Sequence, residues 1–160
     1  MGGLVREVGE IVYRTTEDQL NDSGYVLTTL GASTAGNVKK ATSSNYYRLV
    51  GVNVKSTEDP LNPGTYLDDV PVAIAREGEI RVQLTDASNR STDIHVGDPL
   101  AVFDGGKVAH WADCPINTLL GTVNAANLQK MLTALVGIAL EEVAADEDPD
   151  DGKILVKLKI

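Results

Sequence analysis

The chain has 160 residues, which is the usual length of a single domain. Its content of 42% hydrophobic and 23% charged residues is typical of a globular protein and excludes an intrinsically disordered chain. The 23 acidic and 14 basic residues give a formal net charge of −9. This charge disfavours nucleic acid and anionic membranes as partners, because both require clustered basic side chains.

The first seven residues form a separate segment. Gly2 and Gly3 provide a flexible lead, and apolar and polar side chains follow them. The segment lacks the basic and apolar regions of a secretory signal, so none is predicted. We interpret residues 1–7 as an N-terminal arm with two alternatives: the arm adds a strand to the open sheet edge of a neighbouring protein, or it is a frayed chain terminus.

Alternation of apolar and polar residues predicts β-strands along most of the remaining chain. Turns such as Asp104-Gly105-Gly106 and Asp151-Gly152 separate these strands, because glycine supplies the positive φ that tight turns require. One helix is expected at residues 125–132, with Asn124 as its N-cap. The expected strands are residues 10–14, 50–54, 70–75, 80–84, 100–103, 136–140 and 154–160.

Four pairs of short segments have similar sequences and occur in the same order along the chain. They divide the expected single β domain, residues 8–160, into two units at about 8–84 and 96–160. Neither unit is large enough to close a core alone, so we expect the two to pack together. The predicted fold is all-β: a pseudo-twofold β-barrel or sandwich of two similar β-units, with at most one short helix. The pairs are 8–12 with 96–100, 24–26 with 106–108, 49–52 with 135–138 and 79–84 with 153–158.

Two loops have part of the sequence pattern of a ligand-binding site. Residues 31–36 have the glycine spacing of a phosphate-binding loop, but Asn37 stands where a lysine should contact the phosphates. Residues 146–152 are rich in acidic side chains, but Lys157 occupies the position of the bidentate glutamate in a calcium loop. We therefore expect no cofactor and no metal, and interpret 146–151 as a solvated hairpin tip, with a weak cation site of another type left open.

His110 and Cys114 lie close together in the sequence, at the expected end of a strand. A catalytic cysteine needs a base and a third group that orients the base, and the sequence identifies no such group. The single cysteine also cannot form an intramolecular disulfide or a four-cysteine zinc site. The sequence therefore predicts that the protein is not an enzyme, with a hydrolase that uses His110, Cys114 and an acidic partner as an alternative.

A series of short motifs in a fixed order carries a resemblance to a known family. The motifs are Leu49-Val50-Gly51-Val52, Val72-Ala73-Ile74-Ala75-Arg76-Glu77-Gly78, Val96-Gly97-Asp98-Pro99-Leu100, Asp104-Gly105-Gly106-Lys107-Val108 and Leu135-Val136-Gly137-Ile138-Ala139-Leu140-Glu141. With them the chain resembles the small head decoration, or capsid cement, proteins of tailed bacteriophages and archaeal tailed viruses. The likeness covers about residues 8–160.

This resemblance implies a viral structural protein without catalytic activity or cofactor. Proteins of this family bind the outer surface of the assembled head, commonly as trimers, and stabilise it by bridging neighbouring capsomers. The major capsid protein is then the expected partner, a homotrimer the expected oligomer, and the virion the expected location after synthesis in the host cytoplasm. The candidate residues for the capsid interface are those of the N-terminal arm: Gly2, Gly3, Leu4, Val5 and Arg6.

A second function is compatible with a β-sandwich, namely recognition of a glycan or of a host surface. Tyr46, Tyr47 and Tyr66 lie in expected loops and would provide its contacts. This alternative requires that the three aromatic side chains are exposed.

Overall fold

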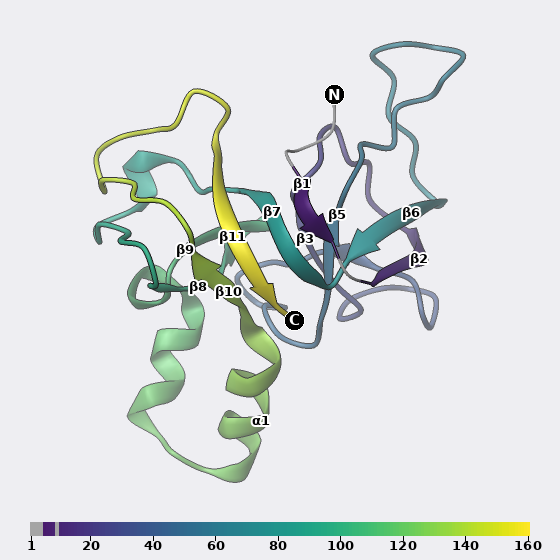
Figure 1. Cartoon of the computed structure of the whole chain (residues 1–160). Helices are drawn as coiled ribbons and strands as arrows, with labels where there is room; N and C mark the ends of the chain where they lie inside the picture. Colours follow the sequence, from purple (N-terminus) through teal and green to yellow (C-terminus); the bar gives the residue numbers. More distant parts are fainter. Residues whose placement is uncertain (1–4, 9) are drawn as a thin grey trace.

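Two antiparallel sheets form the body of the protein, in a computed structural model that describes residues 5–8 and 10–160 (Figure 1). The predicted all-β fold is confirmed. The first sheet has six strands in the order β1 (Val5–Val8), β7 (Glu77–Gln83), β11 (Lys153–Lys159), β10 (Leu135–Ala139), β8 (Pro99–Asp104) and β9 (Lys107–His110). The second has five in the order β2 (Ile11–Thr16), β6 (Val70–Ala75), β5 (Leu49–Asn53), β3 (Val26–Thr28) and β4 (Lys39–Lys40).

Four strands of each sheet have the same connectivity, β2-β3-β5-β6 in the second sheet and β7-β8-β10-β11 in the first. In each set the fourth strand lies between the first and the third, and the third also pairs with the second. Gly51 and Gly137 hold equivalent places in β5 and β10, one residue after a bulge. A Cβ atom would lie 2.3 Å from the Ala75 oxygen at Gly51 and 2.2 Å from the Lys157 oxygen at Gly137. The predicted pseudo-twofold arrangement of two similar β-units is therefore present.

The strand pairing changes the boundary between the two units. The correspondence of 49–52 with 135–138 is found, but residues 79–84 and 153–158 lie in β7 and β11, which pair with each other in one sheet. Gly24 corresponds to Gly97 and not to Gly106, because the Gly24 and Gly97 N–H groups donate to equivalent oxygens, those of Asn53 and Ala139. The chain therefore changes sheet at Arg76, between β6 and β7, instead of between residues 84 and 96.

The main apolar core lies between the two sheets. In the second half of β11 the alternation of the sequence is reproduced, since Val156 and Leu158 are buried and Lys157 and Lys159 are exposed, whereas the first four residues of the strand, 153–156, are all buried. A second cluster covers the other face of the second sheet, and a third lies beneath the helical segment. Fully buried members of the main core include Val26, Val52, Ile80, Val82, Leu100, Val108, Val136, Ile154 and Val156.

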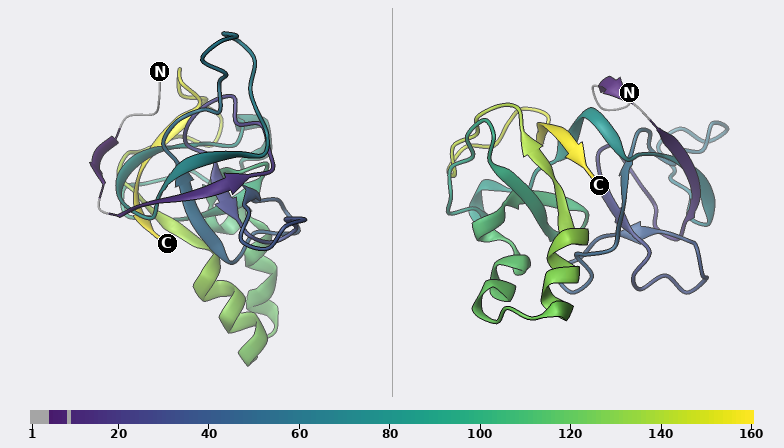
Figure 2. Two further views of the ribbon diagram at one scale, coloured as in Figure 1. Left: turned by 90° about the vertical axis from the view of Figure 1, so that its right-hand side faces the viewer. Right: turned by 60° about the horizontal axis from the view of Figure 1, so that its bottom comes forward.

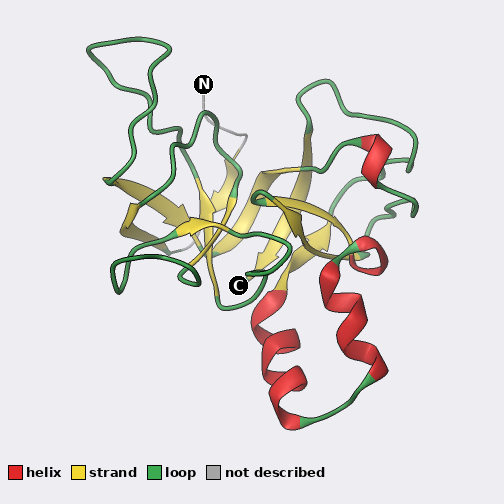
Figure 3. Cartoon of the chain, turned by 180° about the vertical axis from the view of Figure 1, so that it is seen from behind, coloured by secondary structure: helices red, strands yellow, loops and turns green. Residues whose placement is uncertain are grey.

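A helical hairpin projects from one end of the first sheet (Figure 3). It consists of the 3-10 helix η3 (Pro115–Gly121) and the α-helix α1 (Ala125–Ala134), and it connects β9 to β10. The predicted helix is confirmed and extends two residues further. As expected, Asn124 caps it, because its Oδ1 accepts the Asn127 N–H at 2.9 Å. η3 is an addition to the predicted fold; its first residue is Pro115, and its i, i+3 pair Ile116 and Leu119 is buried.

Two shorter 3-10 helices complete the structure, η1 (Ala87–Asn89) and η2 (Trp111–Asp113). None of the helices in the described part of the chain has the length and apolar character needed to cross a membrane.

Candidate docking surface

The helical hairpin carries a concentration of exposed apolar side chains. Leu120 and Leu128 are about half exposed, at 50% and 52%, while Leu132 and Val123 are 73% and 88% exposed. We call these four residues the hairpin patch. Leu128 and Leu132 are four residues apart in α1 and therefore lie on one face of the helix. Contiguous exposed apolar surface on a protein of this size is typical of an interaction site.

The hairpin also differs from the rest of the protein in charge. Residues 115–140 contain one charged side chain, Lys130, so the segment has a net charge of +1. The whole chain has a net charge of −9, which leaves −10 on the remaining residues. Contact through a projection with only one charge would hold this acidic body away from an acidic partner, whose repulsion of the body would otherwise weaken binding.

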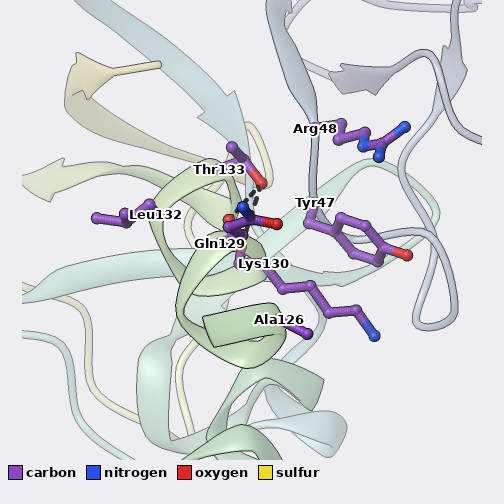
Figure 4. Close-up of a pocket in the computed structure, with 7 residues that line it drawn as sticks. All are labelled: Tyr47, Arg48, Ala126, Gln129, Lys130, Leu132 and Thr133. Carbon is purple, nitrogen blue, oxygen red and sulfur yellow. Dashed lines mark hydrogen bonds between the residues drawn. The ribbon is translucent and has the colours of Figure 1, made fainter. Parts of the chain in front are cut away.

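A groove of about 370 Å³ lies where α1 meets the loop before β5 (Figure 4). Its charged lining residues are Arg48 and Lys130, and both are cationic. The Lys130 Nζ lies 5.2 Å from the centre of the Tyr47 ring, within the range of a cation–π interaction. The groove therefore offers positive charge beside apolar surface, which suits a partner that carries carboxylate or carbonyl oxygens. The other lining residues are Tyr47, Ala126, Gln129, Leu132 and Thr133.

The core fixes the tyrosine side of this groove. The rings of Tyr46 and Tyr47 meet edge to face, with 5.6 Å between their centres, and both pack against the apolar cluster beneath the hairpin. Burial raises the pKa of Tyr46. The Thr28 hydroxyl donates to the Tyr47 carbonyl oxygen at 2.7 Å, which attaches this loop to β3. Pre-ordered side chains of this kind lose little entropy on binding.

The three tyrosines that would contact a glycan are only partly exposed. Tyr46 and Tyr47 are half-buried and pack as described above. Tyr66 is also half-buried and lies in another loop, opposite Glu58 in an isolated bridge. The exposed aromatic set which this alternative requires is therefore not assembled in the structure.

Three of the candidate arm residues, Gly2, Gly3 and Leu4, lie outside the described residues. Val5 and Arg6 belong to β1, which pairs antiparallel with β7 and places Val5 opposite Ile80. This part of the arm therefore extends the first sheet of its own chain.

His110 and Cys114 do not form a nucleophile–base pair. The Cys114 thiol is buried and donates to the carbonyl oxygens of Ala101 and His110, each at 3.3 Å. Burial raises the pKa of Cys114 to about 12, so the thiol stays protonated at neutral pH. The His110 Nδ1 accepts the Ala112 N–H at 3.0 Å, and its Nε2 lies 3.6 Å from the Asp98 carboxylate. This geometry gives no support to the hydrolase alternative.

Two carboxylates of the acidic hairpin tip form contacts within the chain. Asp151 accepts two bonds from Arg81, at 2.6 and 2.9 Å, and these bonds lower its pKa. Asp148 accepts the Ala87 N–H at 2.7 Å and lies 3.6 Å from the buried Arg90. Within residues 5–8 and 10–160, no group of three or more His, Cys, Asp or Glu side chains is arranged to hold a metal ion.

Comparison with protein-family models and with curated proteins gave no match for this chain. The functional interpretation therefore depends on the chain's own residues. The hairpin patch is a candidate site that the sequence interpretation missed, although a signal was present in the absence of acidic residues between 115 and 140.

Proposed function

We propose that the protein is a capsid decoration protein, which binds the outer surface of an assembled viral head and stabilises it by bridging subunits of the major capsid protein. The observation that carries this proposal is the hairpin patch, an apolar and nearly uncharged projection on an acidic all-β body. The sequence resemblance to head decoration proteins supports the same function. A protein that binds only the assembled shell stabilises it by mass action.

The exposed apolar surface of the hairpin patch determines how strongly a single hairpin can bind. Burial of the exposed fractions of its four side chains contributes about 4–8 kcal/mol. Association costs about 4–15 kcal/mol in lost translational and rotational freedom, so one hairpin alone binds weakly. Several hairpins on one oligomer would bind the repeated sites of a shell with much higher avidity. The function therefore needs a homo-oligomer, of which the trimer implied by the resemblance is one form.

The test is co-sedimentation with shells assembled from the major capsid protein of the same virus. The double variant Leu128→Ser/Leu132→Ser should bind at least about tenfold more weakly, because two exposed apolar contacts are lost without disturbing the core. Leu61→Ser is the matched control, since Leu61 is 86% exposed and lies outside the hairpin. We expect it to bind like the unchanged protein.

Heat resistance of the shells provides a second readout. Shells carrying the protein should survive higher temperatures than bare shells, and the double variant should lose this protection. The proposal is wrong if the unchanged protein does not sediment with shells, or if the two hairpin substitutions leave both binding and protection intact.

A further inference from the structure

β2 and β7 are equivalent strands of the two units. The outer edge of β7 is covered by β1, but within the described part of the chain no strand covers the outer edge of β2. β7 lies between β11 and β1, whereas β2 pairs with β6 and stands at the end of the order of its sheet. In the left view of Figure 2, β2 crosses the front of the molecule at this edge. The fold therefore has two equivalent strand positions, one paired on both sides and the other paired on one.

The hydrogen bonds at the end of β2 identify the backbone groups that point outward. The Thr15 oxygen accepts the Val38 N–H and the Glu17 N–H donates to the Val38 oxygen, each at 2.9 Å, on the side of β2 away from β6. The N–H and C=O of a strand residue point to the same side, and successive residues alternate. Ile11 and Tyr13 therefore direct their backbone groups outward, and within the described part of the chain these groups have no partner.

β2 contains no lysine, proline or bulge, and its one charged residue is Arg14. Exposed edge strands are commonly protected by lysine, proline or a bulge. β2 instead has Tyr13, which is 71% exposed, and Ile11, which is 38% exposed. Both line an open hollow of about 390 Å³, whose other lining residues are mostly apolar but include Lys55 and Ser56. An apolar and unpaired edge of this kind fits another strand.

We propose that β2 pairs antiparallel with β2 of a second copy of this chain, about a two-fold axis at Val12. The pairing places Ile11 opposite Tyr13 of the second copy, and Tyr13 opposite its Ile11. Because both residues direct their backbone groups outward, each of these two pairs exchanges two N–H···O=C bonds. The two five-stranded sheets become one continuous sheet of ten strands.

Complementary charges indicate that the strand that pairs with β2 is β2 of a second copy of the chain. In this register Glu10 lies opposite Arg14 of the second copy, twice by symmetry, and both side chains are exposed. An axis at Tyr13 would place Glu10 opposite Thr16 and would require the Thr15 oxygen that Val38 already uses. An axis between two residues would pair outward groups with inward groups. With the axis at Val12 the paired segment is limited to residues 10–14, so it does not need the Thr15 oxygen, and it satisfies both the outward groups of Ile11 and Tyr13 and the charges.

The test is sedimentation velocity over a range of protein concentrations, which does not depend on shell binding or on the proposed function. The mass should rise from 17.0 kDa to twice that value. Glu10→Arg and Arg14→Glu each replace two attractive cross-strand pairs by two repulsive ones, so each should weaken the dimer about tenfold. The double variant Glu10→Arg/Arg14→Glu restores opposite charges and should recover the original dissociation constant.

The three variants share the same exposed positions, so a general loss of folding would affect the double variant as well. Circular dichroism of each variant checks the fold directly. A monomer at all concentrations overturns the proposal, and so does a trimer whose stability none of the substitutions changes. Failure of the double variant to recover, with its fold intact, overturns the register and with it the two-fold pairing at Val12.

Discussion

Gly137 provides the sharpest test of the paired β-units. A Cβ atom at this position would lie 2.2 Å from the Lys157 oxygen and 2.8 Å from a methyl carbon of Val156, whereas ordinary contacts begin near 3.4 Å. Gly137→Ala therefore forces β10 and β11 apart by roughly 1 Å in the middle of the six-stranded sheet. Overpacking together with one or two weakened strand hydrogen bonds costs about 3–5 kcal/mol.

Thermal unfolding followed by circular dichroism measures this effect. At this chain length the expected loss corresponds to a fall of about 10 °C in the melting temperature. Gly51→Ala should have a similar effect, because its Cβ would lie 2.3 Å from the Ala75 oxygen at the equivalent position. Gly121→Ala, with no atom within 4 Å of its Cβ, is the control and should change the melting temperature little. A Gly137→Ala protein as stable as this control would refute the argument.

Three further predictions concern other parts of the chain. The N–H groups of Ser33 and Thr34 hold the pKa of Glu17 at about 2 against a usual 4.5, so its carboxylate stabilises the fold above pH 4.5 and this contribution disappears as the pH falls through 2. Glu17→Gln should therefore flatten the dependence of urea midpoints on pH in this range. Cys114 should react with a thiol reagent at pH 8 only as fast as the protein unfolds, because it is buried with a pKa of about 12; rapid reaction in the native state would contradict this. Deletion of residues 1–7 should weaken shell binding several-fold and lower the melting temperature by less than about 5 °C, because β1, which loses three of its four residues, is an edge strand that pairs with β7 alone. A larger loss of stability would make the arm a structural strand, and unchanged binding would exclude it from the interface.

The sequence predicts a strand or helix correctly where the alternation of its side chains or a capping residue is enough to specify it. The alternation in the second half of β11 and the N-cap at Asn124 are local signals, and both are present in the structure. η3 was missed because its buried pair, Ile116 and Leu119, is too short a pattern to distinguish a 3-10 turn from a loop.

The repeat was recognised from the sequence but mostly aligned to the wrong strands. Gly24 and Gly97 are equivalent because both have φ near +90° and the N–H of each donates to the oxygen of the last residue of β5 or β10. Their neighbours are Ser23 and Tyr25 in one unit and Val96 and Asp98 in the other, so sequence similarity does not connect them. What the two units share at this point is backbone conformation, which permits different side chains.

The candidate docking surface could likewise be predicted only in part from the sequence. The lack of acidic residues between 115 and 140 is visible in the sequence, but only the structure shows that this segment projects as a hairpin. The outward groups of Ile11 and Tyr13 likewise depend on which neighbour β2 pairs with, and no local pattern specifies this.

The two proposed surfaces belong to different sheets, so both can be used at once. The hairpin extends from β9 and β10 of the first sheet, and β2 forms an edge of the second (Figures 1 and 2). A dimer through β2 would present two hairpins, and occupation of two shell sites raises avidity without any new contact. Glu10→Arg should therefore reduce shell binding only through loss of this avidity, and the double charge swap should restore it. The hairpin variant should leave dimerisation unchanged. Loss of dimerisation in that variant would instead show that the hairpin patch is the surface between copies of the chain.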